Sequence, residues 1–229
     1  FAALAYVGES VDDPLRYYHN NVGGTLTLLL ACAEGGVSKF VFSSSCSTYG
    51  QPSPEHIPVP ETCPQCPQSP YGRSKWHCEH VIQDFAESQR RAGRPFACTF
   101  LRYFNVCGAD RTGVLGEDHT PETHLIPVII EAALGRRAHV GLFGTDYPTP
   151  DGTCIRDYVH DEDLVDAHVR TLELLAPGDL RAYNLGIGKG YSVREIIEAV
   201  RHIAKRDFKV VEQPRRAGDV AAVYADPTK

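Results

Sequence analysis

The sequence predicts an α/β protein with a doubly wound, parallel sheet, incomplete at the N-terminus and followed by a smaller C-terminal lobe. Two observations carry this prediction. Apolar, strand-like runs at residues 38–44 and 96–104 flank a proline-free segment, 71–91, that has the length of a helix. A further helix-like segment, 12–35, precedes the first run. Helices therefore alternate with strands at the long spacing that parallel crossovers require.

The first expected helix, 12–35, ends at Gly35 and Gly36. Within it the stretch 20–25 is polar and contains Gly23 and Gly24, which permit close approach of either a neighbouring element or a ligand. Both interpretations stay open. The apolar side of this helix is expected to consist of Leu26, Leu28, Leu29, Leu30 and Ala33.

The strand 38–44 leads into small hydroxyl residues, of which Ser45 is the last before Cys46. Open α/β sheets bind ligands outside the carboxyl ends of their strands. Ser45, a hydrogen-bond donor and acceptor, is therefore expected at the mouth of a ligand site. A proline-rich loop from about residue 50 to residue 70 follows.

The expected helix 71–91 begins after Pro70, a residue suited to a first helical turn. Tyr71 and Lys75 are four residues apart, so both side chains emerge on one face of it. A free tyrosine ionises near pH ~10, and a nearby ammonium group favours the phenolate. The pair alone also fits a half-buried tyrosine beside a solvated lysine, but a strand-end Ser45 upstream favours a catalytic pair.

Beyond Asn105 the sequence becomes rich in glycine and aspartate. We therefore assign residues 1–105 to the sheet domain and 106–229 mainly to the second lobe. Ser192 and Glu195 form a capping box, and the glycines before them do not match a phosphate-binding loop. Arg215 and Arg216 suit either an anion site or a solvated surface pair. The expected elements are a loop at 106–122, helices at 124–135, 161–175 and 193–205, and strands at 139–143 and 155–158.

Composition excludes several classes of protein. The net charge is −6, from 23 basic and 29 acidic residues, and no apolar run is long enough to span a bilayer, so neither nucleic acid nor membrane is an expected partner. Eight cysteines in a large-core chain suggest free thiols in the cytoplasm. The chain has no Met, and its first residues resemble the end of a strand. This suggests that an N-terminal segment is missing. No metal site is predicted, because the histidine gap in the set Cys63, Cys66, His77 and His80 is shorter than in zinc fingers.

Several short motifs of the sequence, in this order, resemble those of the UDP-glucose 4-epimerases, a family of extended short-chain dehydrogenases/reductases. Together these motifs are specific for that family, whereas Tyr-x-x-x-Lys alone indicates only the superfamily. They are Phe1-Ala2-Ala3-Leu4, Phe42-Ser43-Ser44-Ser45, Ser69-Pro70-Tyr71-Gly72, Leu101-Arg102-Tyr103-Phe104-Asn105, Arg156-Asp157-Tyr158-Val159-His160, Tyr183-Asn184-Leu185-Gly186 and Arg215-Arg216-Ala217-Gly218-Asp219.

This resemblance implies a Rossmann-like sheet domain, a substrate lobe, bound NAD and a UDP-hexose inverted at C4 through a 4-keto intermediate. Tyr71 would take the C4 hydroxyl proton, Ser45 would relay or hold it, and Lys75 would keep Tyr71 acidic. The resemblance leaves a homodimer open. It places Phe1, Ala2, Ala3, Asn20, Asn21, Ser45, Tyr71, Lys75 and Phe104 at NAD, and Ser45, Tyr71, Tyr103, Asn105, His124, Leu125, Gly141, Phe143, Arg156, Arg216, Asp219 and Val223 at the UDP-sugar.

Departures from the family pattern matter. The glycine-rich first turn of the NAD site does not occur in the sequence, so weak NAD binding is expected of this chain. His124 stands in place of an asparagine and is expected to take over its hydrogen bond, while the small Val223 predicts that UDP-N-acetyl sugars also fit.

Three functions other than UDP-glucose 4-epimerisation need to be compared with the sequence. A 4,6-dehydratase is disfavoured because Cys46-Ser47-Thr48 offers no carboxylate. A 4-epimerase of UDP-N-acetylglucosamine or UDP-xylose, and a non-catalytic nucleotide-sugar sensor, stay as alternatives.

Overall fold

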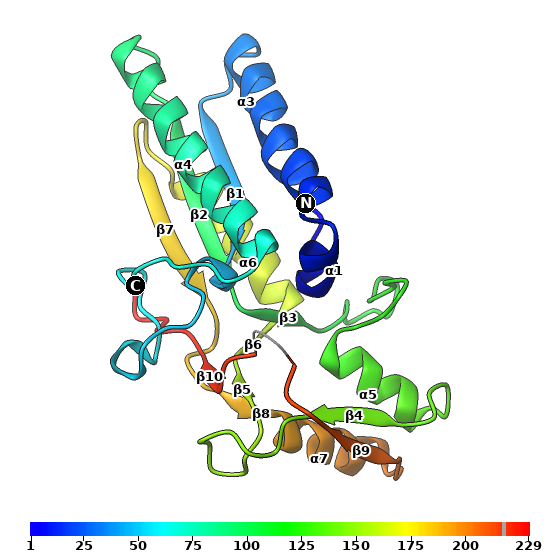
Figure 1. Cartoon of the computed structure of the whole chain (residues 1–229). Helices are drawn as coiled ribbons and strands as arrows, with labels where there is room; N and C mark the ends of the chain where they lie inside the picture. Colours follow the sequence, from blue (N-terminus) through cyan, green and yellow to red (C-terminus); the bar gives the residue numbers. More distant parts are fainter. Residues whose placement is uncertain (217–218) are drawn as a thin grey trace.

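Three parallel strands form the central sheet of the computed structural model, which describes residues 1–216 and 219–229 (Figure 1). Strand β1 (Lys39–Ser45) pairs with β2 (Ala97–Tyr103) in a register that sets Ser45 beside Tyr103. Strand β7 (Leu180–Leu185) adds to the other edge of β2. The sequence signal for β7 is a short run with polar interruptions, and no strand was predicted there.

Helices cover both faces of this sheet. Helix α4 (Pro70–Arg91) and helix α3 (Gly24–Glu34) share an apolar core with β1 and β2 that includes Leu29, Phe42 and Ile82. Helix α6 (Asp161–Leu174) also packs against β1 and β2, and its His168 contacts the side chain of Ser43. The phenylalanines of β1 at even positions and Ser43 thus serve opposite faces, as alternation along a strand requires. The predicted doubly wound, parallel sheet is confirmed.

The helix predicted over 12–35 forms, but it starts at Pro14 and contains a π-helical turn. The chain forms α1 (Val7–Asp12), α2 (Pro14–Tyr17), a π-helical turn η1 (Tyr18–Gly23) and then α3, and the backbone stays helical from Pro14 to Glu34. Asp13 separates α1 from this helix with φ −132°, and its side chain accepts a hydrogen bond from the Arg16 amide. In the π-helical turn, the Asn21 side-chain amide bonds both the N–H and the carbonyl of Leu4. The N-terminal segment is thereby held against this helix.

The apolar side expected for that helix also needs correction. Leu29 is buried and packs in the sheet core with Cys32. Leu26, Leu28 and Leu30, however, are 47%, 50% and 67% exposed. A helix with leucines at consecutive positions cannot bury all of them against one sheet, because they point around most of its circumference.

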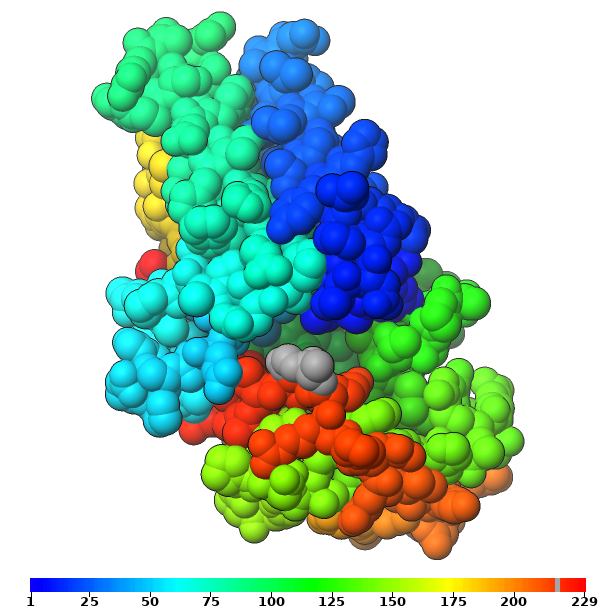
Figure 2. Space-filling view, in the orientation of Figure 1, coloured from blue at the N-terminus to red at the C-terminus, as the bar shows by residue number. Residues whose placement is uncertain are grey.

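The remaining elements form a second part of the molecule, below the sheet in Figures 1 and 2. The predicted capping box of Ser192 and Glu195 is present. The strands at 105–107, 191–192, 210–213 and 222–223 were not predicted, and the strand predicted at 155–158 is divided into 155–156 and 158–160. The elements are helices α5 (Leu125–Ala133) and α7 (Val193–Ala204), the pairs β3 (Asn105–Cys107) with β6 (Tyr158–His160) and β4 (Val140–Phe143) with β9 (Val210–Gln213), and the sheet β10 (Ala222–Val223), β5 (Ile155–Arg156), β8 (Tyr191–Ser192).

Helix α6 and strand β7 return to the first sheet. Residues 161–185 therefore lie with the sheet, although the sequence placed 106–229 mainly in the second lobe. The division of the chain into two functional domains stays a prediction. No helix among residues 1–216 and 219–229 has the length and apolar character that crossing a bilayer takes.

Candidate active site

The N-terminus of α4 is fixed where β1 ends. Ser69 caps the helix by accepting a hydrogen bond from the Gly72 amide at 3.1 Å, and Pro70 occupies the first turn, as predicted. A Cβ on Gly72 would lie 2.5 Å from the carbonyl oxygen of Ser47, so only glycine allows this close approach. The approach brings the first turn of α4 against the residues that follow β1.

Tyr71 and Ser45 meet at this junction. Both side chains are almost fully buried, and the Ser45 hydroxyl accepts a hydrogen bond from the Ser47 amide at 3.1 Å. Burial raises the pKa of Tyr71 well above its usual range, while a hydrogen bond with the Ser45 side chain acts in the lowering direction. The expected easier ionisation of this phenol is therefore opposed by the protein interior, because burial disfavours the charged form.

Lys75 lies on the same side of α4 as Tyr71. Its Nζ atom is 5.9 Å from the centre of the Tyr71 ring and donates a hydrogen bond to the Ser43 carbonyl at 2.8 Å. Burial lowers the pKa of Lys75 to about 8. No carboxylate lies within ion-pair distance of it among the described residues. A buried ammonium that has used one of three donors can still bind a hydroxyl or an anion.

The sequence did not predict one neighbour of this group, His168. His168 of α6 lies 3.3 Å from the Ser43 hydroxyl through Nε2, and its Nδ1 is 2.8 Å from the Leu164 carbonyl. This second contact makes Nδ1 the donor, so Nε2 accepts from Ser43. The ring centre of Tyr103 lies 6.2 Å from that of His168. Helix α6 thus supports the strand end from the opposite face, a long-range contact that no local pattern signals.

The residues expected at NAD surround the N-terminal segment. Asn20 donates a hydrogen bond to the Ala2 carbonyl at 3.1 Å, and Asn21 holds the backbone of Leu4. Phe1 is 92% exposed, and Ala2 and Ala3 are exposed too. Phe104, in contrast, is buried in a core with Tyr49 and Val223, so its ring offers no surface to a cofactor.

The free hydrogen-bond donors of Lys75 fit a dinucleotide such as NAD. The buried Lys75 ammonium has free donors beside Tyr71, in a place where the described residues supply no counter-charge. A ligand with hydroxyl groups satisfies those donors. The exposed backbone of Phe1–Ala3, tied down by Asn20, borders the same strand end.

Five of the residues expected at the UDP-sugar come together in the second lobe. Arg156 lies 3.8 Å from the Asp219 carboxylate, and Arg216 lies 3.1 Å from it, so two guanidinium groups converge on one acid. Arg216 also stacks over Phe143, 4.7 Å from the ring centre. Gly141 makes room for that ring, because a Cβ there would lie 2.9 Å from it. Both guanidinium groups keep donors for a diphosphate.

The other expected sugar contacts are more scattered. Asn105 is exposed and donates its side-chain amide to the Asp157 carbonyl at 3.1 Å. His124 occupies the N-cap position of α5 beside the half-buried Leu125, and its exposed ring bonds Glu122. Val223 is almost fully buried in a core with Phe104 and Tyr49. Arg215 is engaged by Asp146 at 2.7 Å, which favours the surface-pair interpretation for it, and Gly218 lies outside the described residues.

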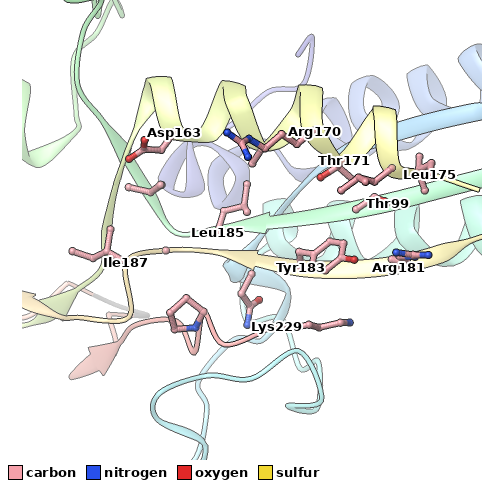
Figure 3. Close-up of a pocket in the computed structure, with 16 residues that line it drawn as sticks. Thr99, Asp163, Arg170, Thr171, Leu175, Arg181, Tyr183, Leu185, Ile187 and Lys229 are labelled. Carbon is pink, nitrogen blue, oxygen red and sulfur yellow. The ribbon is translucent and has the colours of Figure 1, made fainter.

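A cavity of about 500 Å³ lies elsewhere, between helix α6 and strand β7 (Figure 3). Arg170 and Thr171 of the helix and Tyr183 of the strand contribute to its wall. Ser45, Tyr71 and Lys75 do not line it. The group at the N-terminus of α4 is the better candidate for chemistry, because its acid–base side chains are buried at the carboxyl end of β1 and Lys75 lies 5.9 Å from the centre of the Tyr71 ring.

The four residues considered above as zinc ligands do not come together in the structure. Cys63, Cys66, His77 and His80 form no cluster of three or more ligating atoms in residues 1–216 and 219–229. All eight cysteines are free thiols.

Comparisons with known proteins agree along the whole chain. A family model described as the NAD dependent epimerase/dehydratase family matches residues 1–186. The UDP-glucose 4-epimerase of Rhizobium meliloti (strain 1021) is 49% identical over 230 residues, which cover 100% of this chain and 68% of that protein.

Solved structures give the same result. A UDP-glucose 4-epimerase from Brucella ovis, in complex with NAD, matches with a TM-score of 0.90 and 49% identity over 99% of this chain and 68% of that one. One from Bifidobacterium longum, in complex with NAD+ and UDP, matches with a TM-score of 0.93 and 40% identity over 100% of this chain and 67% of that one. The chain therefore belongs to the NAD dependent epimerase/dehydratase family.

Proposed function

We propose that this chain carries the catalytic residues of an NAD-dependent 4-epimerase that interconverts UDP-galactose and UDP-glucose. The observation that carries the proposal is the contact group of Ser45, Tyr71 and Lys75 at the carboxyl ends of parallel strands. Its relatives at 49% identity are UDP-glucose 4-epimerases, one of them solved with NAD.

NAD, when bound, supplies a reversible two-electron oxidation at C4 of the sugar. Tyr71 takes the proton of the C4 hydroxyl and later returns it to the 4-keto oxygen, after the sugar has turned its other face to the site. Ser45, buried beside Tyr71, relays or holds that proton. Lys75 favours the Tyr71 anion by its charge.

The substrate is held by its diphosphate. Arg156 and Arg216 converge on Asp219 and present guanidinium donors to the phosphates, while Phe143 and Gly141 form a flat surface for the uracil. Asn105, Tyr103, His124 and Leu125 border the sugar. We expect His124 to reach it only after releasing Glu122.

Two finer points belong to the proposal. Leu26 and Leu30 of α3 lie about one helical turn apart and leave exposed apolar side chains on one face, which suits a homodimer contact. The eight free thiols suit the reducing cytoplasm.

The test is sugar interconversion by the protein expressed from its complete gene. We expect turnover of UDP-galactose to UDP-glucose, and a loss of ~10²-fold or more in kcat in Tyr71→Phe, because the general base is removed. Tyr191→Phe in β8 is the matched control and keeps activity. Binding of UDP-sugar without turnover identifies a sensor instead and ends the enzyme proposal.

The same assay with UDP-N-acetylglucosamine tests the choice of sugar. Turnover is expected because Val223 is small. If the N-acetyl sugar is not converted while UDP-galactose is, the prediction drawn from Val223 fails and the epimerase proposal stands.

A further inference from the structure

Four side chains that play no joint part in the proposed reaction converge in the loop before α5. Glu117, His119, Glu122 and His124 each offer one ligand atom, and all four atoms lie within 4.8 Å of one another. The Nδ1 atom of His124 lies 2.8 Å from the Glu122 carboxylate and 4.0 Å from that of Glu117. His119 contacts Glu117 through the same ring nitrogen.

The distances approach those of a metal centre. Tetrahedral zinc with imidazole and carboxylate ligands at ~2.1 Å sets its ligand atoms ~3.4 Å apart. The pairs of His124 with Glu122 and of His119 with Glu117 are closer than this and would have to separate, whereas atoms up to 4.8 Å apart would have to approach. Two imidazoles with two carboxylates select zinc and neighbouring transition metals, whereas magnesium and calcium prefer oxygen ligands alone.

A second observation distinguishes this group from a chance cluster of surface charges. The side chain of Glu122 is only 8% exposed, although those of its three neighbours are 36–48% exposed. Its carboxylate is oriented by the His124 backbone N–H at 2.6 Å. A carboxylate held in one orientation beside two histidines can act as a metal ligand together with them.

The loop is also supported from α1. The ring of Tyr6, just before that helix, packs 5.6 Å from His119 and 5.9 Å from His124 between ring centres, and its hydroxyl donates to the Pro121 carbonyl. The loop that leads into α5 passes close below α1 in Figure 1. An ion at this place joins the second lobe to the sheet domain.

We propose that Glu117, His119, Glu122 and His124 form a binding site for one zinc-class divalent cation. The ion replaces the two imidazole–carboxylate contacts with four metal bonds and fixes the loop 117–124 against Tyr6. Of its four residues, only His124 is shared with those proposed to border the sugar.

The experiment is titration of the chelator-treated, untagged protein with Zn²⁺ in competition with a chromophoric chelator, with Co²⁺ absorption as a second readout. We expect one ion per chain and the intense visible bands of tetrahedral cobalt. His119→Gln and His124→Gln should each weaken binding by at least the ~10- to 100-fold that loss of an outer-shell partner costs. Glu122→Gln, which keeps the shape of the side chain, should act likewise.

His139→Gln and His202→Gln remove exposed histidines elsewhere and are the matched controls. Cys66→Ser removes an exposed thiol that competes for zinc. Zinc should also raise the Tm of the wild type and leave that of His119→Gln/His124→Gln unchanged. Equal zinc affinity in wild type and double variant, or tetrahedral cobalt bands lost only in Cys66→Ser, overturns the proposal.

Discussion

Tyr71 illustrates a conflict between burial and chemistry at the level of one residue. A phenol needs about 4 kcal/mol of anion stabilisation to ionise near neutrality from its ordinary pKa of ~10. Burial raises the pKa of Tyr71 above that value, so the requirement here is larger. The hydrogen bond with Ser45 supplies part of the stabilisation, and positive charge near the phenol must supply the rest.

Ser45→Ala therefore shifts the pH profile of the reaction. Loss of a hydrogen bond that lowers the pKa of Tyr71 moves the acid limb of kcat to higher pH, because the unprotonated base is needed. A net hydrogen bond of ~1 kcal/mol corresponds to a displacement of about 1 pH unit. Ser45→Thr, which keeps the hydroxyl, should restore the original limb. An unchanged limb in Ser45→Ala contradicts a role for Ser45 in tuning Tyr71.

Lys75 gives the folded protein a predictable dependence on pH. Burial lowers its pKa to about 8, whereas an unfolded lysine titrates near ~10.4. Between these values the unfolded chain binds more protons, so this residue makes stability rise with pH through that window. Its cost is fully present below pH ~8 and amounts to about 3 kcal/mol.

Urea unfolding at pH 7.5 and 9.5 measures this. In Lys75→Met the rise in unfolding free energy between the two values should be smaller than in wild type by roughly 2 kcal/mol. Lys39→Met, at an exposed site on β1, should keep the wild-type rise. The same pH dependence in Lys75→Met as in wild type contradicts a depressed pKa.

Helix α4 is joined to strand β2 by a buried ion pair. Arg102 contacts the Glu79 carboxylate at 2.6 and 2.9 Å, and their side chains are 7% and 0% exposed. Ser44 and Gln65 donate further hydrogen bonds to the same carboxylate. The pair fixes the depth at which α4 lies on the sheet, and hence the place of Tyr71.

Glu79→Ala should destabilise the protein by about 3–5 kcal/mol, because it leaves Arg102 buried without a counter-charge. Glu87→Ala on the same helix is the control, since Glu87 pairs with Arg90 and Arg91 at the surface. Its cost should be no more than about 1 kcal/mol. Equal midpoints of chemical unfolding in the two variants contradict a structural role for the buried pair.

Elements with a local signal could be predicted from the sequence, and those with a tertiary cause could not. Helix α4 begins at Pro70 and ends at Arg91, one residue from the predicted start. Local capping and uninterrupted periodicity determine it. The π-helical turn instead contains Asn21, which reaches the backbone of Leu4, 17 residues away. Ser45 and Tyr71 were predictable as a strand end and a helix start, whereas His168 reaches Ser43 across 125 residues.

At the scale of the whole molecule, Asp157 connects the sheet to the second lobe. It lies between β5 and β6 and is fully buried. Its carboxylate accepts hydrogen bonds from the backbone N–H groups of Ile187, Gly188 and Ala225 at 2.9–3.2 Å. A Cβ at Gly186 would lie 2.5 Å from the carboxylate, so glycine is required there. One side chain thus binds the segment leaving β7 to the C-terminal segment.

Asp157→Ala should lower the free energy of unfolding by about 3 kcal/mol or more, because three buried N–H groups lose their acceptor at ~1–3 kcal/mol each. Asp157→Asn keeps the size and one acceptor oxygen but turns an amide donor toward the other N–H groups, so its loss should be intermediate. Asp163→Ala, at an exposed carboxylate in the first turn of α6, is the control and should change stability by less than about 1 kcal/mol. Urea unfolding of the three variants measures the order of their unfolding free energies. If Asp157→Ala is as stable as Asp163→Ala, the two parts of the molecule are held together by apolar packing alone.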